Sequence, residues 1–201
     1  ASVALHAYNV AKKDRQFDTV IILGLGPIGI LLASWCKLNK IKNVIGVDRN
    51  QNRFKNFKDL GFKNIIDTNK DDFSSKLNDY TSNKGVEIAF ECSGSVELLN
   101  KGILSLSKGG KIVVLSNQTK DITLDQKILN KFLRQEIRIV GSWSSVIEPH
   151  NEWLETLDAL NSGKFSIKGL ISHKYKFSDA KNIFPDLFEK KFKYSKILLQ
   201  P

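Results

Sequence analysis

The feature that most constrains this 201-residue chain is the glycine-rich segment Gly24-Leu25-Gly26-Pro27-Ile28-Gly29. Before it, Thr19–Leu23 is β-branched or aliphatic throughout, as in a buried strand, whereas Pro27–Asn39 has a helical period with proline in its first turn. At this spacing, Gly24 permits a tight turn, Gly26 lets a pyrophosphate approach the backbone, and Gly29 lets the helix pack on the strand. The helix N-terminus also attracts anions. The segment therefore predicts a phosphate site, with an ordinary βα turn as the alternative.

Strand-like and helix-like segments alternate six times along the first two thirds of the chain. Runs such as Val20–Leu23 and Ile112–Leu115 are apolar at consecutive positions, which indicates strands of a parallel sheet covered by helices on both faces. This pattern predicts an α/β fold with a Rossmann-type, doubly wound, six-stranded parallel sheet. The expected strands are Thr19–Leu23, Asn43–Val47, Asn64–Asp67, Val86–Cys92, Lys111–Ser116 and Glu136–Ser142. The expected helices between them are Pro27–Asn39, Asn50–Leu60, Asp72–Ser82, Val96–Leu106 and Asp125–Leu133.

Further dinucleotide contacts follow from this fold. Asp48 ends the second strand, where a carboxylate can accept hydrogen bonds from both hydroxyls of an adenosine ribose, although it could instead cap the next helix. Arg53 lies one helical turn further on and could reach the same ribose, and Arg49 could accommodate the 2′-phosphate of NADP. We give more weight to Asp48 and predict NAD. The carboxyl ends of the later strands supply the other candidates, which are Cys92, Ser93, Gly94, Leu115, Ser116, Asn117, Gly141, Ser142 and Trp143.

Composition argues against several other functions. The net charge is +10, but 31 basic residues are interleaved with 21 acidic ones, which favours a solvated surface over a nucleic-acid partner. There is no secretion signal and no apolar stretch near the length of a membrane span, and two cysteines are too few for a disulfide framework. We therefore expect a cytoplasmic protein without a membrane partner. His6, His150 and His173 are isolated, so we predict neither a metal ligand nor a catalytic residue.

The two ends of the chain do not belong to the sheet pattern. Residues 1–14 predict a lead-in helix without a capping residue before it, and the chain has no methionine. We therefore expect an excerpt of a larger protein, with a processed natural N-terminus as the alternative. After Trp143 the rhythm changes to a helix at 153–160, a strand at 170–175, a helix at 178–190 and a last strand at 196–200. We therefore divide the chain into an NAD-binding domain at 1–143 and a C-terminal segment at 144–201 that packs on something absent from the chain.

Several segments together resemble the zinc-dependent medium-chain alcohol and polyol dehydrogenases. They are VALHAYNVA, TVIILGLGPIGILLASWCK, VIGVDRNQNRF, LGFKNIIDT, GVEIAFECSGS, KGGKIVVL and EIRIVGSW. The stretch KFLRQEIRIVGSWSSVIEPHNEW most resembles the polyol and sugar-phosphate members, such as sorbitol and galactitol-1-phosphate dehydrogenases. In that family, an N-terminal GroES-like catalytic domain supplies the zinc ligands. The resemblance implies that the C-terminal segment completes this missing domain.

The resemblance also implies a function. The full-length parent would oxidise a polyol or sugar-phosphate alcohol to a ketone by hydride transfer to NAD, with zinc in the parent only, and this chain alone would be inactive. It implies that Ser2 and Val3 lie near the nicotinamide and that Lys196 reaches the pyrophosphate. It further implies homodimers or homotetramers that pair through the edge of the sixth strand. A non-catalytic NAD(H)-sensing module is one alternative, but it would not be expected to carry a dehydrogenase-like tail. A methyltransferase is another, but its sheet would usually end with an antiparallel hairpin, which this sequence does not indicate.

Overall fold

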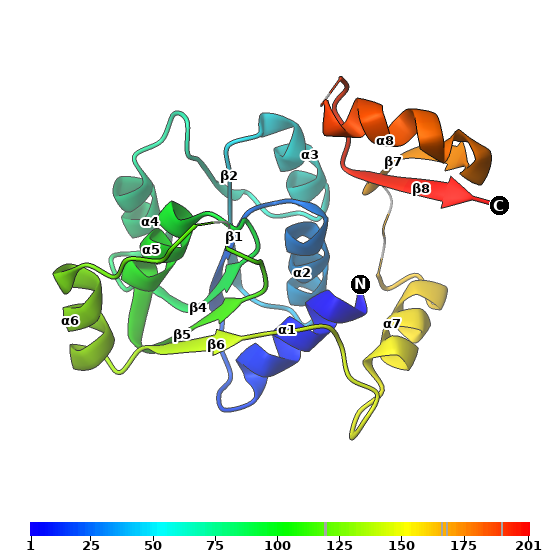
Figure 1. The fold of residues 1–201 in the computed structure, drawn as a ribbon. Helices are drawn as coiled ribbons and strands as arrows, with labels where there is room; N and C mark the ends of the chain where they lie inside the picture. Colours follow the sequence, from blue (N-terminus) through cyan, green and yellow to red (C-terminus); the bar gives the residue numbers. More distant parts are fainter. Residues whose placement is uncertain (119, 166, 168, 190) are drawn as a thin grey trace. The chain divides into compact units, whose positions relative to one another are not determined.

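The computed structural model describes residues 1–118, 120–165, 167, 169–189 and 191–201, and it divides into two compact units, Ala1–Phe165 and Ser166–Pro201. The first unit contains a six-stranded parallel sheet with the order β3-β2-β1-β4-β5-β6 (Figure 1). The strand order reverses between β1 and β4, as in a doubly wound fold, which confirms the predicted fold class. The strands are β1 (Thr19–Leu23), β2 (Asn43–Asp48), β3 (Asn64–Asp67), β4 (Val86–Glu91), β5 (Leu106–Val114) and β6 (Arg138–Gly141).

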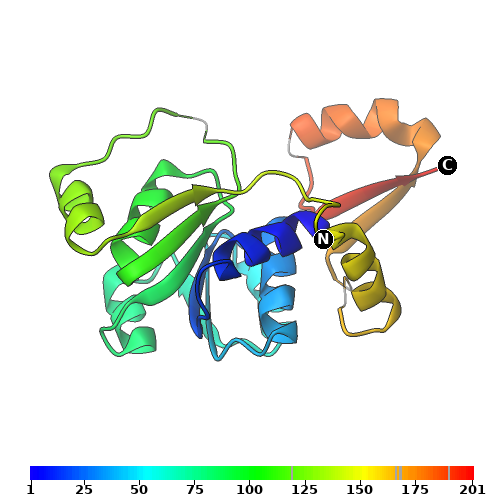
Figure 2. The same ribbon diagram turned by 90° about the horizontal axis from the view of Figure 1, so that it is seen from below.

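Two groups of helices enclose this sheet (Figures 1 and 2). In one group, α1 packs against α2, and α2 packs against α3. The other group, α4, α5 and α6, supplies apolar side chains to a core cluster that includes Ile21, Leu23 and Ile45. Residues that alternate along β1 therefore face opposite layers, which explains why every residue from Val20 to Leu23 is buried. The helices are α1 (Ser2–Lys12), α2 (Pro27–Leu38), α3 (Gln51–Asp59), α4 (Phe73–Thr81), α5 (Val96–Ser105) and α6 (Gln126–Arg134).

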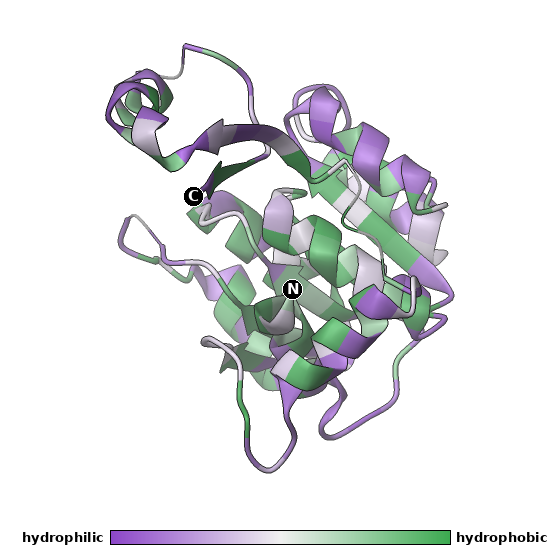
Figure 3. Ribbon diagram, turned by 90° about the vertical axis from the view of Figure 1, so that its right-hand side faces the viewer, coloured by the Kyte–Doolittle hydropathy of each residue, from purple (hydrophilic) through white to green (hydrophobic). Residues whose placement is uncertain are grey.

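Capping side chains set where most of these helices begin. Asn50, Asp72, Ser95 and Asp125 precede α3, α4, α5 and α6, and each accepts a hydrogen bond from a backbone N–H of the first turn. Helices α2 to α6 agree with the predicted ranges to within one residue at each end, whereas α1 ends two residues before the predicted end at residue 14. Strand β5 begins five residues before its predicted start, because Leu106 already pairs with Val86 ahead of a register shift. The helices carry both hydrophobic and hydrophilic residues (Figure 3), as expected for elements that cover a sheet.

The first unit extends beyond the boundary that we expected after Trp143. Helix α7 (Glu152–Asn161) packs on α1, where the side chain of Glu152 accepts hydrogen bonds from Asn9 and contacts the ring of His6, each at 3.0 Å. The ring of Phe165 lies 4.8 Å from that of Trp35 in α2. Glu152 is almost completely buried. A buried carboxylate is rare enough that the hydropathy pattern alone gave no reason to place this helix with the sheet.

The second unit is a small βαβ element. Strands β7 (Ile171–Lys176) and β8 (Lys196–Gln200) pair in parallel and are connected through a short 3₁₀ turn, η1 (Phe177–Asp179), and helix α8 (Ala180–Phe188). The predicted helix at 178–190 corresponds to these two elements, and Lys190 lies outside the described residues. Within the described part of the chain, no helix has the length and hydrophobicity needed to cross a membrane.

Candidate functional site

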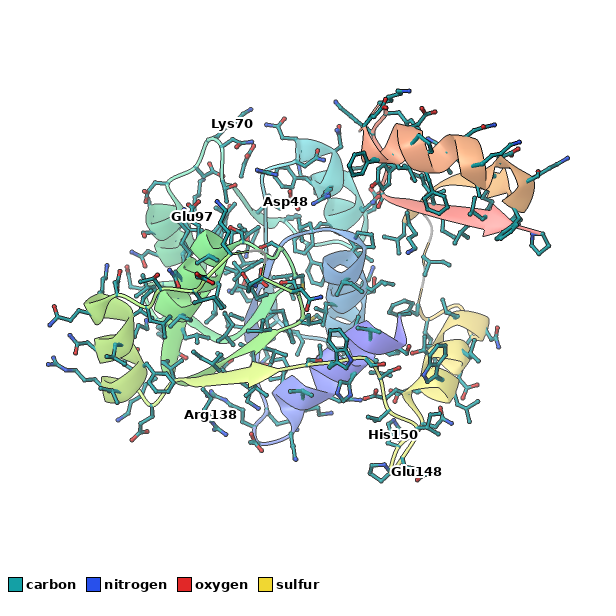
Figure 4. All side chains as sticks on the ribbon, viewed as in Figure 1. Asp48, Lys70, Glu97, Arg138, Glu148 and His150 are labelled. Carbon is teal, nitrogen blue, oxygen red and sulfur yellow. The ribbon has the colours of Figure 1, made fainter. Side chains whose placement is uncertain are left out.

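A cleft of about 1030 Å³ opens at the carboxyl ends of β1, β2 and β4. This is the point where the strand order reverses, and ligands of doubly wound sheets bind there. Asp48 and Glu97, both on its wall, are labelled in Figure 4. Nine predicted site residues line the cleft, namely Gly24, Gly26, Pro27, Asp48, Arg49, Arg53, Cys92, Ser93 and Gly94. Its other lining residues are Thr68, Asn69, Ser95, Val96, Glu97, Leu98 and Lys120.

The three glycines of the turn differ in what surrounds them. Gly24 has a φ of +97°, and its N–H donates to the Val47 carbonyl at 2.8 Å, so the turn itself needs glycine there. A Cβ on Gly29 would lie 2.0 Å from the Gly24 carbonyl oxygen, which means that α2 packs directly on the turn. A Cβ on Gly26 would meet only Arg53 Nη1, at 4.0 Å. Gly26 therefore leaves open space at the cleft instead of supporting the turn.

Helix α2 differs from the other crossover helices at its N-terminus. Gly26 is its N-cap, has no side chain to offer, and is followed by Pro27 in the first turn. The N-termini of α3, α4, α5 and α6 all have a capping side chain. The first turn of α2 begins beside the cleft, at Gly26 and Pro27, and its N–H groups have no side-chain cap. Such an end combines free donors with the positive pole of the helix dipole, and it suits an anionic group such as a pyrophosphate.

Asp48 is tied to three parts of the site. Its carboxylate accepts hydrogen bonds from the Leu25 N–H at 2.8 Å, the Asn50 N–H at 2.8 Å and Arg53 Nη1 at 3.0 Å. The side chain is 4% exposed, whereas that of Arg53 is 41% exposed. The N-cap of α3 is Asn50, so the capping role considered for Asp48 belongs to its neighbour. Asp48 instead holds the glycine turn against the end of β2, and Arg53 covers it from the solvent side.

A second buried carboxylate, Glu91, was missed by the sequence analysis. It ends β4, is completely buried, and accepts hydrogen bonds from Ser93, Gly94, Ser116 and Gln118. The sequence predicted a strand that continues to Cys92, in which Glu91 is an ordinary strand residue. A charge at the end of a largely apolar strand, directly before the small residues Cys92, Ser93 and Gly94, is the signal that could have identified it.

The remaining predicted residues do not line the cleft. The N–H of Leu115 donates to the Glu91 carbonyl, and that of Ser142 donates to the Val114 carbonyl, so both extend the sheet at its carboxyl edge. Trp143 is 76% exposed. Ser116 reaches the site indirectly, through Glu91. The assignments of Leu115, Ser116, Gly141, Ser142 and Trp143 stay predictions, as does that of Lys196, which begins β8 in the second unit.

The described ionisable groups around the cleft provide neither an activated thiol nor a metal site. Burial raises the pKa of the Cys92 thiol well above its usual value, and the neighbouring Glu91 and Cys36 raise it further, so the thiol stays protonated. Among the described residues, no three His, Cys, Asp or Glu side chains gather in a group that could hold a metal ion. His6 and His150 contact Glu152 and Glu155, and His173 packs on aromatic rings. The site is therefore equipped to bind a ligand, with no metal centre beside it in this part of the chain.

The chain is similar to known dehydrogenases over most of its length. Residues 27–162 match the family model described as zinc-binding dehydrogenase. Sorbitol dehydrogenase from Halalkalibacterium halodurans is 31% identical over 163 residues, which are 81% of this chain and 46% of that protein. The chain spans about half the length of the curated relatives that it matches.

Solved structures share the fold over the whole chain. A dehydrogenase from Escherichia coli CFT073, crystallised with NADH, has a TM-score of 0.84 at 19% identity and is matched over 57% of its length. A zinc-binding dehydrogenase from Sinorhizobium meliloti, crystallised with NADP, has a TM-score of 0.81 at 19% identity, also over 57% of its length. Both matches cover 100% of this chain.

Proposed function

Since this chain belongs to the zinc-binding dehydrogenase family, we propose that it is the NAD(H)-binding portion of a dehydrogenase that oxidises a polyol or sugar-phosphate alcohol to a ketone. The similarity to a sorbitol dehydrogenase supports a polyol as the substrate class. The relatives with bound NADH and NADP support a nicotinamide cofactor, and Asp48 supports NAD as the preferred one. A non-catalytic sensing module fits the same cleft, but it would not account for a family match that continues to residue 162.

The observation that carries this proposal is the uncapped start of α2 behind Gly26, with Asp48 fixed beside it. The pyrophosphate would accept hydrogen bonds from the first N–H groups of α2, over the space that Gly26 leaves open. The carboxylate of Asp48 has about four acceptor positions and already uses three. One position is free for a ribose hydroxyl, and a second becomes free if the half-exposed Arg53 turns aside.

When bound, the nicotinamide ring exchanges a hydride with the alcohol carbon, while the protein orients the two groups. No set of zinc ligands lies among the described residues, so we assign no step of the reaction to a metal here. We propose instead that the ligands belong to the part of the relatives that this chain does not span, and that the chain alone does not turn over substrate. We also propose that dimers or tetramers form through β6, the edge strand, where Ile139 is exposed.

Titration calorimetry with NADH tests the cofactor role. We expect the unmutated chain to bind NADH and not S-adenosylmethionine, and we expect Gly26→Val to abolish NADH binding because a branched side chain fills the space for the pyrophosphate. Gly26 has a φ of −66°, which valine can adopt, so the variant should unfold at the same temperature as the unmutated chain. Unchanged NADH affinity in the folded variant would exclude the glycine turn as the phosphate site.

An activity assay tests whether the chain suffices for catalysis. With added zinc, NAD and either sorbitol or galactitol 1-phosphate, we expect no reduction of NAD. Turnover comparable to that of a full-length sorbitol dehydrogenase would contradict the assignment of the metal centre to a region outside this chain.

A further inference from the structure

Glu91 has an unusual number of donors around it. Its Oε1 accepts hydrogen bonds from the Ser93 N–H at 2.8 Å, from Ser93 Oγ, and from the Gly94 N–H at 3.0 Å. Its Oε2 accepts from Ser116 Oγ and from Gln118 Nε2, the latter at 3.0 Å. The side chain is completely buried. A buried carboxylate is tolerated only when its lone pairs are satisfied, and here donors from two separate loops satisfy them.

This network links the loop after β4 to the loop after β5. Ser93 and Gly94 line the cleft, and Ser116 and Gln118 follow the neighbouring strand. The Gly94 N–H also donates to Ser116 Oγ at 2.9 Å, which closes a ring of hydrogen bonds around the Glu91 carboxylate. Gly94 has a φ of +71°, so its backbone shape also depends on glycine. Glu91 therefore ties the cleft residues Ser93 and Gly94 to the loop after β5.

Gln118 adds an independent observation. Both hydrogen bonds given for its amide NH₂ go to this network, to Glu91 and Ser116. Its Oε1 is buried and has no partner among the described residues. Glu91 thus fixes the side chain in an orientation that leaves a buried acceptor unsatisfied, which costs free energy in the unliganded protein. A ligand that brings an N–H donor would remove that cost.

We propose that Glu91 is the positioning residue for the nicotinamide end of the cofactor, and that it presents Gln118 Oε1 as an acceptor for the carboxamide N–H. This inference rests on the proposed function. In a doubly wound sheet each half binds one mononucleotide. The glycine turn and Asp48 belong to the half formed by β1–β3 and take the adenosine end, so the half formed by β4–β6 takes the nicotinamide.

Comparing NADH with ADP-ribose, which lacks the nicotinamide ring, isolates this role. In Glu91→Gln, an NH₂ group replaces one acceptor oxygen and faces N–H and O–H donors with which it cannot form the same hydrogen bonds. The loops after β4 and β5 then lose part of the network that links them. We expect NADH to bind about tenfold more weakly, as for one lost hydrogen bond to a charged group, with ADP-ribose affinity unchanged. Ser116→Ala removes one donor to Glu91 and should weaken NADH binding by about threefold, again without changing ADP-ribose binding.

Glu87→Gln is the matched control. Glu87 lies near the other end of the same strand, and its carboxylate also accepts several hydrogen bonds, from Arg15 and from the Asp18 and Thr19 N–H groups. We expect this variant to bind both ligands as the unmutated chain does, even if its unfolding temperature falls.

The outcomes separate the two proposals. If the unmutated chain binds neither ligand, the proposed function itself is wrong. If the unmutated chain binds both, but Glu91→Gln weakens both by the same factor or weakens neither, the dinucleotide site stands and the positioning role of Glu91 is wrong. If Glu91→Gln does not fold, the same comparison in Ser116→Ala decides.

Discussion

Replacing Gly29 with alanine tests how α2 is joined to the glycine turn. The added Cβ would lie 2.0 Å from the Gly24 carbonyl oxygen, 3.1 Å from the Gly24 carbonyl carbon and 3.2 Å from Ile22 Cγ2. Carbon and oxygen atoms that are not bonded do not approach much below about 3 Å, so the start of α2 must retreat by about 1 Å. The obstacle is backbone, and no side-chain rotation can relieve it.

The size of the effect follows from two opposing contributions. Forcing an extra methyl group into a packed contact costs typically about 1–3 kcal/mol, and a fixed backbone carbonyl places this case at the upper end. Alanine is favoured over glycine inside a helix by up to about 1 kcal/mol. We therefore expect Gly29→Ala to lower the free energy of unfolding by about 2 kcal/mol. For a chain of this length, that corresponds to a fall of about 4–8 °C in Tm.

Thermal unfolding followed by circular dichroism measures this change, with Gly26→Ala as the matched control. At Gly26 the nearest atom to the added Cβ is Arg53 Nη1 at 4.0 Å, so we expect Tm to stay within about 1 °C. Calorimetry should give the complementary result, in which Gly26→Ala weakens NADH binding although its fold is intact. An unchanged Tm in Gly29→Ala would refute the packing argument.

Two further variants test the charges of the first unit. We expect NADH to bind about tenfold more tightly than NADPH. A 2′-phosphate beside Asp48 meets a repulsion of roughly 4 kcal/mol, which Arg53, paired with Asp48, and the adjacent Arg49 reduce to about 1.4 kcal/mol. Asp48→Ser should narrow that gap in calorimetry at constant salt, and equal affinities in the unmutated chain would contradict the assignment. Lys111→Met should lower the free energy of unfolding by about 2–4 kcal/mol, because the buried Nζ donates to the carbonyls of Val10 and Ala11 and pairs with Asp14. Thermal unfolding measures this change, with Lys108→Met at an exposed position as the control. We expect the control to lower the free energy of unfolding by less than about 0.5 kcal/mol. Equal decreases in the two variants would rule out a special role for Lys111.

The strands and crossover helices could be predicted from the sequence because each leaves a local signal. Consecutive apolar residues mark the buried strands, and Asn50, Asp72, Ser95 and Asp125 mark where helices begin. The packing of α7 on α1 left no such signal, because its central contact is the buried carboxylate of Glu152. The burial of such a charged residue depends on hydrogen-bond partners far away in the chain, and a hydropathy pattern predicts that the residue is exposed to solvent.

The site shows the same division between local and distant information. Gly24, Gly26 and Gly29 have roles that follow from their spacing, since each acts within one turn. Glu91 could not be recognised in this way, because two of its donors, Ser116 and Gln118, lie 25 and 27 residues further along. Only the sheet order, which places β4 beside β5, brings them together.

Asp48 combines both kinds of information, and this affects how its variants must be interpreted. Its place at the end of β2 predicts a ribose ligand, and the structure adds a hydrogen bond that its carboxylate accepts from the Leu25 N–H inside the glycine turn. Loss of NADH binding in Asp48→Ser could therefore come from a loosened turn as well as from a lost ribose contact. A loosened turn should weaken NADH and NADPH alike, because the two cofactors share the pyrophosphate that we propose binds at the start of α2. Removal of the carboxylate affects the two cofactors differently, because only NADPH carries a 2′-phosphate. The ratio of the two affinities, and not either affinity alone, therefore measures the effect of the Asp48 charge.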